Sequence, residues 1–193
     1  MEYAARKPLS DMKRSTRTSS TADAQFSDER LEAIFRQYWE PLCRILYQIL
    51  GDWDEAEDLA LETMVQLHRR PPADERNLAG WLYRVATNLG LNALRSRKRR
   101  ARYEGEVGRE TLDIAAPADP ASTAEHHLEQ EWVQQALQSI RPRSAQILLL
   151  RYSGLSYKEI ADALDLSAAS VGTVLARSEL EFERAFQKLR GQD

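Results

Sequence analysis

Apolar side chains recur at helical spacing from the start of the ordered-looking part of the chain. The first apolar stripe begins after Ser27, contains Pro41 and stops at Gly51; its members are Leu31, Ile34, Phe35, Tyr38, Trp39, Leu42, Ile45, Leu46, Ile49 and Leu50. This period is typical of a helix buried on one side. Ser favours an N-cap and Gly a C-cap, whereas Pro fits only a first turn. The pattern predicts a helix capped by Ser27, a new or kinked segment at Pro41, and an end at Gly51.

Two further amphipathic segments follow. WDEAEDLALETMVQLHRR has Asp52 before it as a cap, two prolines after it, and Leu59, Ala60, Met64 and Leu67 on its buried side. RNLAGWLYRVATNLGLNALRSRKRRARY, residues 76–103, has Asn77 as a cap. Its apolar back contains Leu78, Trp81, Leu82, Val85, Leu89, Leu91 and Leu94, and its polar front contains Arg84, Thr87, Asn88, Asn92 and Arg95. We expect a helix in each segment.

The second half of the chain contains a helix-turn-helix pattern. Leu128, Trp132, Val133, Leu137 and Ile140 suggest one helix, and Pro142 begins the next, which ends at Ser153-Gly154. LSYKEIADALDLSAASVGTVLARSELEFERAFQKLR then places Ile160 and Ala161 in a first helix, a turn at Asp165-Leu166, and Ser167 as the cap of a second helix. This spacing is typical of helix-turn-helix units, although short helical hairpins in solenoid proteins resemble them.

Composition divides the chain into four parts. Residues 1–25 are rich in Ser and Thr and poor in large apolar residues, which is typical of a disordered extension. Residues 104–124 are acidic, contain Pro117 and Pro120, and predict a flexible linker. We therefore predict an all-α protein with two small helical domains, residues 26–103 and 125–193, joined by this linker. The second domain contains the helix-turn-helix.

Positive charge is concentrated in one segment. The chain has a formal net charge of −3, yet residues 76–103 carry eight Arg or Lys side chains and no Asp or Glu. Asn and Arg suit the edges of bases, and clustered Arg and Lys suit phosphates. The segment predicts a nucleic-acid contact, although a solvated helix with a basic tail has the same composition. Because the chain is acidic overall and the linker carboxylates can shield this helix, we expect weak binding of duplex DNA by the free protein.

The preceding helix has the opposite charge. No Lys or Arg lies between Arg44 and Arg69, and the first half of the predicted helix carries Asp52, Asp54, Glu55, Glu57, Asp58 and Glu62. Acids in a first turn complement the helix dipole, but Glu62 lies beyond that turn. A carboxylate face suits a basic protein partner, while ordinary surface charge is the simpler explanation.

Composition also excludes several classes of protein. No apolar run approaches the ~20 residues that span a bilayer, and the N-terminus lacks the apolar part of a secretory signal. The single Cys43 excludes an internal disulfide and a multi-cysteine zinc site, and His68, His126 and His127 lack metal-ligand spacing. No nucleophile elbow or phosphate loop is present. We expect a cytoplasmic protein that is not an enzyme, has no cofactor and does not insert into membranes.

Two segments together resemble one family. EAEDLALETMVQLH followed by NLAGWLYRVATN is similar to the core domain of bacterial sigma factors, and IRPRSAQILLLRYSGLSYKEIADAL is similar to their promoter-binding C-terminal domain. The resemblance covers about Phe26 to Leu189 in the same order, and the short linker is typical of the extracytoplasmic-function group. It implies a transcription initiation factor whose partners are core RNA polymerase and promoter DNA. Family members are often held by an anti-sigma protein, and nothing in the sequence identifies one.

The resemblance also implies roles for individual residues. Glu57, Asp58, Glu62 and Gln66 match positions that dock on the largest polymerase subunit. The promoter −10 element would be recognised by Arg76, Asn77, Trp81, Arg84, Asn88, Asn92 and Arg95, with a flipped base captured near the first three. DNA phosphates would contact Arg97, Lys98, Arg99 and Arg100. The linker resembles the segment that lies in the RNA exit path of polymerase.

The −35 element would be recognised by the second helix of the helix-turn-helix, through Ser167, Ala169, Ser170, Gly172, Thr173 and Arg177. Here the chain departs from the usual GTVKSRLHRAR: when Val171 is aligned with its Val, Gly172 replaces the usual Lys, and Glu179, Glu181 and Glu183 follow. An alternative alignment places Gly172-Thr173-Val174 on GTV. The first alignment keeps Val171, Leu175, Ser178, Phe182, Ala185 and Leu189 on one helical seam. This alignment implies that the contact with the −35 element involves fewer charged side chains than is usual in the family.

Two other functions explain parts of the sequence. A helix-turn-helix regulator that binds an operator without polymerase would account for the second domain, but it would leave the acidic and basic helices unexplained. A decoy of the first domain would keep the acidic dock without binding promoter DNA. Association with core polymerase distinguishes the regulator from a sigma factor.

Overall fold

The computed structural model describes residues 26–104 and 120–191, and every regular element in these ranges is helical. The elements are α1 (Asp28–Leu50), α2 (Trp53–Arg69), the 3-10 helix η1 (Glu75–Asn77), α3 (Leu78–Glu104), α4 (Pro120–Ser139), α5 (Pro142–Tyr152), α6 (Tyr157–Leu164) and α7 (Ala168–Arg190). The predicted all-α fold is confirmed. The predicted N-terminal extension, and residues 105–119 of the predicted linker, lie outside the described residues.

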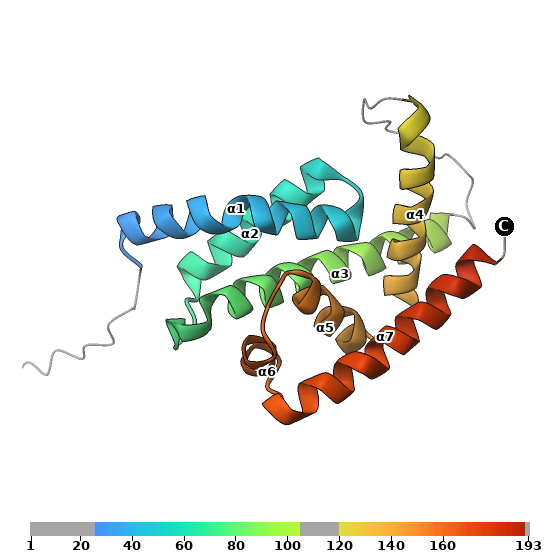
Figure 1. Cartoon of the computed structure of the whole chain (residues 1–193). Coiled ribbons are helices and arrows are strands. Elements are labelled where there is room, and N and C mark those ends of the chain that lie inside the picture. Colours follow the sequence, from blue (N-terminus) through green and yellow to red (C-terminus); the bar gives the residue numbers. More distant parts are fainter. Residues whose placement is uncertain (1–25, 105–119, 192–193) are drawn as a thin grey trace, which may run out of the picture.

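α3 runs through the middle of the molecule (Figure 1). α1 and α2 pack against one side of it, and α5 and α6 pack against another. α4 contacts both α1 and α3, and α7 packs on α4, α5 and α6. We call α1–α3 the first module and α4–α7 the second module.

The ends of α1 and α2 follow from local chemistry. Ser27 Oγ accepts a hydrogen bond from the Arg30 backbone N–H (3.3 Å), and Gly51 ends α1 with a φ of 72°. Gly adopts this left-handed conformation readily because it has no β-carbon. Asp52 caps α2 by accepting from the Glu55 N–H (2.9 Å). All three boundaries lie where the sequence predicted them.

Pro41 does not start a new segment. α1 continues without interruption from Asp28 to Leu50, with Pro41 inside it. Pro41 lies on the exposed side, whereas Ile34, Leu42 and Ile45 are buried. A proline inside a helix costs about 3 kcal/mol, but each fully buried Leu or Ile contributes about 1.5–3 kcal/mol. Burial of the apolar stripe therefore outweighs the local preference of proline for a first turn.

α3 approaches α1 closely at Gly90 and buries one polar residue beside it. A β-carbon on Gly90 would lie 3.0 Å from Leu46 Cδ2, so the missing side chain lets the two helices pack together. Thr87 is fully buried, and its hydroxyl donates to the Tyr83 carbonyl oxygen (2.6 Å). The prediction that Thr87 lies on the polar front of this helix is therefore wrong. Bonding to its own helix allows the hydroxyl to enter the core without an unpaired polar group.

α6 and α7 form the predicted helix-turn-helix. Ser156 and Glu159 form a capping box at the start of α6, Asp165 ends α6 with a φ of 52°, and Ser167 caps α7. The preceding α4 begins at Pro120, which falls within the predicted linker. Pro is well suited to a first helical position because its missing N–H has no helical partner there.

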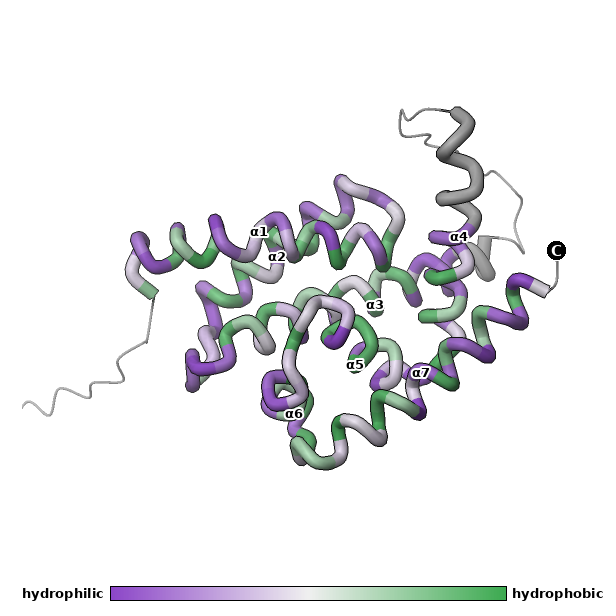
Figure 2. Tube along the Cα trace, viewed as in Figure 1, coloured by the Kyte–Doolittle hydropathy of each residue, from purple (hydrophilic) through white to green (hydrophobic). Residues whose placement is uncertain are grey.

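The two modules share buried apolar surface. The larger core cluster combines residues of α1–α3 with Leu137, Ile140, Ala145 and Leu149 of the second module. A smaller cluster lies within α5–α7, and Tyr83 of α3 packs against it. Along α1 and α7, hydrophobic and hydrophilic positions alternate turn by turn, as one-sided burial requires (Figure 2). The sequence did not predict this packing between the modules.

Glu181 of α7 is bonded to the start of α5. Its carboxylate accepts from the Arg141 backbone N–H (2.9 Å), from Arg141 Nη2 (2.9 Å) and from Ser144 Oγ (2.7 Å). Hydrogen bonding to Arg141 lowers the pKa of Glu181 from 4.5 to about 2. The folded second module therefore stabilises the charged form of this carboxylate.

We expect Glu181→Gln to lower the free energy of unfolding at neutral pH by about 1 kcal/mol, a modest value because the partner Arg141 is 71% exposed and screened by water. A lowered folded-state pKa contributes stability above the unfolded-state value of 4.5, and that stability is lost as the pH falls toward about 2. The difference from wild type in urea unfolding should therefore shrink below pH 4.5. The exposed neighbour Glu179→Gln is the control, and a pH-independent difference would contradict the assignment.

Candidate nucleic-acid interface

The outer face of α2 carries the residues predicted to dock on polymerase. α2 buries Ala56, Ala60, Thr63 and Leu67 in the core. Asp58 is exposed on the outer face and Glu57, Glu62 and Gln66 are half-buried beside it, while Leu61 is 51% exposed. Among the described residues, no ion pair involves Glu57, Asp58 or Glu62. An acidic face whose carboxylates form no ion pair, with an exposed apolar side chain among the acids, is available to a basic partner.

Two side chains of α2 orient acids on this face. Trp53 Nε1 donates to Glu57 (2.9 Å), and Gln66 Nε2 donates to Glu62 (3.0 Å). Both pairs are four residues apart, a spacing that places side chains next to each other on a helix. The predicted docking residue Gln66 therefore positions Glu62 in the free protein.

Arg76 is oriented by Asp74 in the loop before α3. Arg76 Nε donates to both Asp74 carboxylate oxygens (3.0 and 2.8 Å), and the Arg76 backbone N–H donates to Asp74 Oδ1 (2.9 Å). These hydrogen bonds lower the pKa of Asp74 to about 2. Asp74 is thus ionised near neutral pH, and the exposed guanidinium of Arg76 has its direction set before any ligand arrives.

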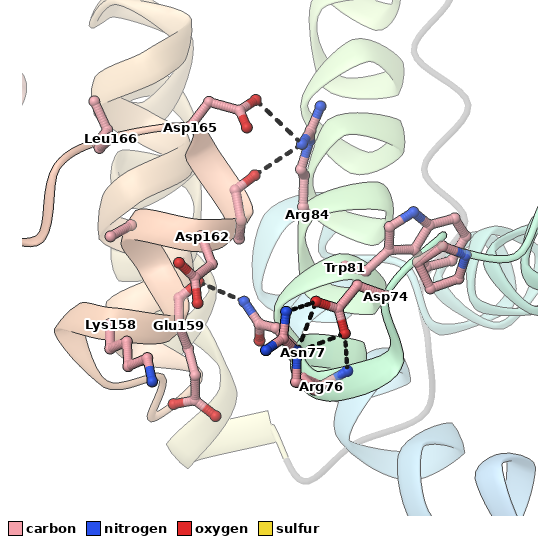
Figure 3. A pocket seen from close by; sticks show the side chains of 13 residues that line it. Asp74, Arg76, Asn77, Trp81, Arg84, Lys158, Glu159, Asp162, Asp165 and Leu166 are labelled. Carbon is pink, nitrogen blue, oxygen red and sulfur yellow. Dashed lines mark hydrogen bonds and ion pairs between the residues drawn. The ribbon is translucent and has the colours of Figure 1, made fainter.

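A cleft of about 810 Å³ lies between the start of α3 and α6 (Figure 3). One wall contains Arg76, Asn77, Trp81 and Arg84 of the first module, and the other contains Lys158, Glu159, Asp162 and Asp165 of the second. The structure therefore brings predicted −10 residues together with the first helix of the helix-turn-helix.

Asn77 and Arg84 form hydrogen bonds across this cleft. Asn77 Oδ1 accepts from the Gly80 N–H (3.0 Å), as expected of a cap, and its Nδ2 donates to the Glu159 backbone oxygen (2.8 Å). Arg84 Nη1 donates to the Ala163 backbone oxygen (2.9 Å) and lies 3.7 Å from Asp165 Oδ2. Both side chains are therefore engaged by the second module.

Asn88, Asn92 and Arg95 continue along α3. Asn88 Oδ1 accepts from Nε2 of Gln146, a buried residue of α5 (2.8 Å). Asn92 is exposed, and with Arg95, Ser96, Lys98 and Arg99 it lines a hollow of about 430 Å³. Within the described ranges, Arg95 Nη2 is buried and has no hydrogen-bond partner. The second module thus bonds to α3 as far as Asn88, and both Asn88 and Asn92 are exposed.

The four predicted phosphate contacts differ in their surroundings. Lys98, Arg99 and Arg100 are exposed at the C-terminal part of α3. Arg97 instead donates through Nη1 to the Leu50 carbonyl oxygen (2.8 Å) and through Nη2 to the Glu55 carboxylate. The guanidinium of Arg97 thereby links α3 to the turn between α1 and α2, so in the free protein it has a structural role that the sequence did not indicate.

α7 presents part of the predicted −35 set to solvent. Thr173 and Arg177 are exposed, whereas Val171, Leu175 and Ser178 are buried, as the alignment through Val171 requires. Two members of the set, Ser167 and Ser170, are hydrogen-bonded to each other at the start of the helix (Oγ to Oγ, 2.9 Å). Of the two remaining members, Ala169 is exposed and Gly172 is half-buried, and a β-carbon on Gly172 would lie 3.5 Å from Tyr157 Cε2 of α6.

Two other kinds of feature, a metal site and a membrane-spanning helix, are absent from residues 26–104 and 120–191. These residues contain no group of three or more His, Cys, Asp or Glu side chains placed to hold a metal ion, and no helix long and apolar enough to cross a membrane. Burial raises the pKa of the Cys43 thiol to about 11, which keeps the thiol protonated and unreactive at neutral pH.

Comparison with known families accounts for both modules. Residues 34–100 match the family model of sigma-70 region 2, and residues 130–181 match that of sigma-70 region 4. This chain belongs to the sigma-70 family. The first match contains α2 and most of α3, and the second contains the helix-turn-helix. The resemblance noted in the sequence is therefore confirmed.

The relatives of this sigma factor assign it to the extracytoplasmic-function (ECF) group. The ECF RNA polymerase sigma factor SigE of Mycolicibacterium smegmatis is 32% identical over 82% of this chain and 60% of the relative. The ECF sigma factor SigG of Mycobacterium tuberculosis is 33% identical over 82% of this chain and 50% of the relative. The chain thus spans half to three fifths of the length of these two relatives. RNA polymerase sigma factor YlaC of Bacillus subtilis is 26% identical over 86% of this chain and 96% of its own length.

The fold is also found among solved structures. The sigma factor RpoE from Bartonella quintana, solved in complex with the anti-sigma factor NepR, aligns with a TM-score of 0.52 and 20% sequence identity. The alignment covers 81% of this chain and 96% of that chain.

Sequence reasoning missed the residues of the second module that contact α3. Gln146, Glu159 and Asp165 lie against Asn88, Asn77 and Arg84, respectively. The one sequence feature that could have indicated this contact was polar Gln146 within the apolar run AQILLL. The acceptors on Glu159 and Ala163 are backbone carbonyls, which leave no signal in a sequence.

Proposed function

We propose that this sigma factor binds core RNA polymerase and directs it to specific promoters. The observation that carries the proposal is the order of two matched regions on one chain, region 2 followed by region 4. Region 2 supplies an unpaired acidic face on α2 and an Arg- and Asn-rich side of α3, and region 4 supplies a helix-turn-helix. A regulator without polymerase would require only the last of these features.

α2 docks on polymerase in this proposal. Glu57, Asp58 and Glu62 form no ion pair among the described residues, and Leu61 is exposed beside them. Complementary charge speeds association and sets the orientation of the partners, while an exposed Leu adds apolar contact. Gln66 holds Glu62 in place.

α3 contacts the −10 element. The amide groups of Asn88 and Asn92 can form paired hydrogen bonds with base edges, and Arg84 and Arg95 lie on the same helix. Arg76, Asn77 and Trp81 line the cleft in which a flipped base would be held, with the ring of Trp81 as a stacking surface. The exposed Lys98, Arg99 and Arg100 contact phosphates, which position the DNA without recognising its sequence.

α7 contacts the −35 element through Thr173 and Arg177, together with Ser167, Ser170 and Gly172 at its start. Exposed Glu179 and Glu183 follow Arg177, and they reduce the attraction to DNA phosphates. Recognition of the −35 element should therefore depend less on salt than a recognition helix rich in Lys and Arg would.

The partners in this proposal are core RNA polymerase and promoter DNA. An anti-sigma protein is a further candidate partner, because the structural neighbour was solved with one. We also propose that the chain acts in the cytoplasm, where polymerase is found, and that it has no enzymatic activity of its own.

Run-off transcription with core RNA polymerase on a library of random promoter sequences tests this function. We expect transcripts from a subset of templates that share two short elements, and none from core polymerase alone. The competing function is a helix-turn-helix regulator. That alternative would be favoured if the chain bound duplex DNA specifically by itself and failed to associate with core polymerase in a pull-down.

A further inference from the structure

Arg97 differs from the basic residues that follow it on α3 in what surrounds its guanidinium group. Residues 98–100 are exposed, whereas only 36% of the Arg97 side chain is exposed. Arg97 Nη1 donates to the Leu50 backbone oxygen (2.8 Å), and Arg97 Nη2 donates to the Glu55 carboxylate. Both terminal nitrogens of this guanidinium are therefore bonded to acceptors within the protein.

The acceptors of Arg97 belong to the turn between α1 and α2. Leu50 is the last residue of α1, where backbone carbonyls lack helical partners. Asp52 caps α2, and its Oδ2 lies 3.9 Å from Arg97 Nη2. Glu55 lies in the first turn of α2. One side chain of α3 thus contacts the end of α1, the cap of α2 and the first turn of α2.

Glu55 bonds to α3 instead of completing the cap of its own helix. Asp52 and Glu55 have the spacing of a capping box, in which each side chain accepts from the backbone N–H of the other residue. The Asp52 side chain does accept from the Glu55 N–H (2.9 Å), but the Glu55 carboxylate accepts from Arg97. Glu55 and Arg97 are 42 positions apart in the chain. The first turn of α2 is therefore held by α3 as well as by its own cap.

The start of α2 determines where the acidic outer face of this helix points. Trp53 is the first residue of α2 and is 43% exposed, and its Nε1 donates to Glu57 (2.9 Å), so the face begins at this turn. Glu62 lies about 14 Å beyond Trp53 along the helix axis, at about 1.5 Å per residue. A tilt of about 10° at the turn would move Glu62 by about 2 Å, which is enough to break a hydrogen bond or an ion pair.

We propose that Arg97 is a positioning residue for polymerase docking, which holds the start of α2 against α3 so that the acidic face is presented in one orientation. The inference rests on the proposed function, because the orientation of α2 matters only if α2 docks. It also removes Arg97 from the set of phosphate contacts. Binding a phosphate would break the bonds to Leu50 and Glu55 and leave the Glu55 carboxylate, which is 28% exposed, without its cationic partner.

Arg97→Ala and Lys98→Ala are a matched pair of variants for testing this inference. Both remove one positive charge from neighbouring positions on α3, but only Arg97 is bonded to the turn. The test measures the affinity of each full-length chain for labelled core polymerase, at a temperature at which circular dichroism shows the variants folded. We expect Arg97→Ala to bind about tenfold more weakly, because the loss of its charge-assisted hydrogen bonds leaves about one molecule in ten with α2 in the docking orientation. Lys98→Ala should bind like wild type.

The salt dependence of promoter binding distinguishes a positioning residue from a phosphate contact. It is measured with polymerase saturated by each chain, so that weaker docking does not enter the result. Loss of one phosphate contact reduces the slope of log affinity against log salt by about 1. We expect this reduction for Lys98→Ala and the wild-type slope for Arg97→Ala. A reduced slope for Arg97→Ala, with undiminished affinity for polymerase, would identify Arg97 as a phosphate contact and overturn the inference.

A double-mutant cycle tests whether Arg97 acts through Glu55. We expect Glu55→Ala to reduce polymerase affinity in the wild-type chain and to have little further effect in Arg97→Ala, because the two residues act as a unit. Asp54→Ala, which alters an exposed acid of the same turn, is the control and should have the same effect in both backgrounds. Additive losses for Glu55→Ala and Arg97→Ala would contradict the link between them.

Arg97→Lys is the conservative variant, and it replaces Arg97→Ala in each measurement if the latter does not fold. Lys keeps the positive charge but lacks the planar fork that bonds to two acceptors at once. Its affinity for polymerase should therefore lie between those of wild type and Arg97→Ala. Wild-type affinity in both Arg97→Lys and Arg97→Ala would refute the positioning role.

A local probe separates failure of this inference from failure of the proposed function. Fluorotryptophan labelling marks the four Trp residues, and Trp53→Phe identifies the fluorine resonance of Trp53. We expect Arg97→Ala to shift or broaden this resonance in the free chain and Lys98→Ala to leave it unchanged. An unchanged resonance in both variants would overturn the inference, whether or not the chain binds polymerase. If the resonance responds but even the wild-type chain fails to bind core polymerase, Arg97 still positions α2 and it is the proposed function that fails.

Discussion

Reversal of two charges on α2, Asp58→Arg together with Glu62→Arg, is expected to abolish association with core polymerase and leave the fold intact. The two acids are free of ion pairs among the described residues, so little within the protein depends on them. At a basic interface the substitutions replace attraction by repulsion. Like-charge contacts cost several kcal/mol, so we expect affinity to fall on the order of 100-fold or more in a pull-down or titration.

The control for this variant is the same change of charge on α1, Glu32→Arg with Glu40→Arg. Both residues are exposed, and their pairs with Arg36 and Arg44 are surface pairs, which contribute only about 0.3–0.5 kcal/mol each. The α1 variant should bind polymerase like wild type. Unchanged affinity of the α2 variant, with its helical circular dichroism preserved, would show that α2 is not the docking surface.

Substitution of the amides on α3 is expected to give a base-specific defect in promoter opening. Asn88→Ala or Asn92→Ala removes a group that can bond to a base edge, and each good bidentate contact discriminates by about 1–3 kcal/mol. Permanganate footprinting of the holoenzyme on matched templates measures opening. The complex with polymerase is the right sample, because Asn88→Ala in the free chain also removes the bond to Gln146.

Two other variants separate the remaining DNA contacts. Neutralising Lys98 and Arg99 should weaken binding to all promoters alike and reduce the slope of log affinity against log salt by about 1 per phosphate contact. Arg177→Ala should act only on templates with an intact −35 element. Equal loss of opening with and without that element would contradict the separate roles of α3 and α7. A change confined to −35 preference in the Asn variants would contradict the placement of α3 on the −10 element.

The expectation that the free chain binds DNA weakly did not take contacts between the modules into account. That expectation assigned the shielding to acidic residues of the linker, of which residues 105–119 lie outside the described residues. In the structure, α5 and α6 instead bond directly to Asn77, Arg84 and Asn88.

The sequence by itself determined the local structure of this protein and its family. The boundaries at Ser27, Gly51, Asp52 and Ser167 were predictable because capping depends on a side chain and the backbone groups within a few residues of it. The helix-turn-helix was predictable for the same reason, since its turn, cap and inner seam have fixed spacing. The acidic face of α2 also followed from the sequence alone, because the acids lie within one helix.

Only the tertiary structure decided how these parts are used. α1 passes through Pro41 because the buried stripe on its other side is worth more than one missing hydrogen bond. Arg97 bonds to Leu50 and Glu55 instead of facing solvent, because α3 lies against the turn between α1 and α2. The contact between α3 and α6 depends on the backbone carbonyls of Glu159 and Ala163 and on the packing of two modules. Such contacts join residues far apart in the chain and have no periodicity, so they become visible only when the helices are assembled.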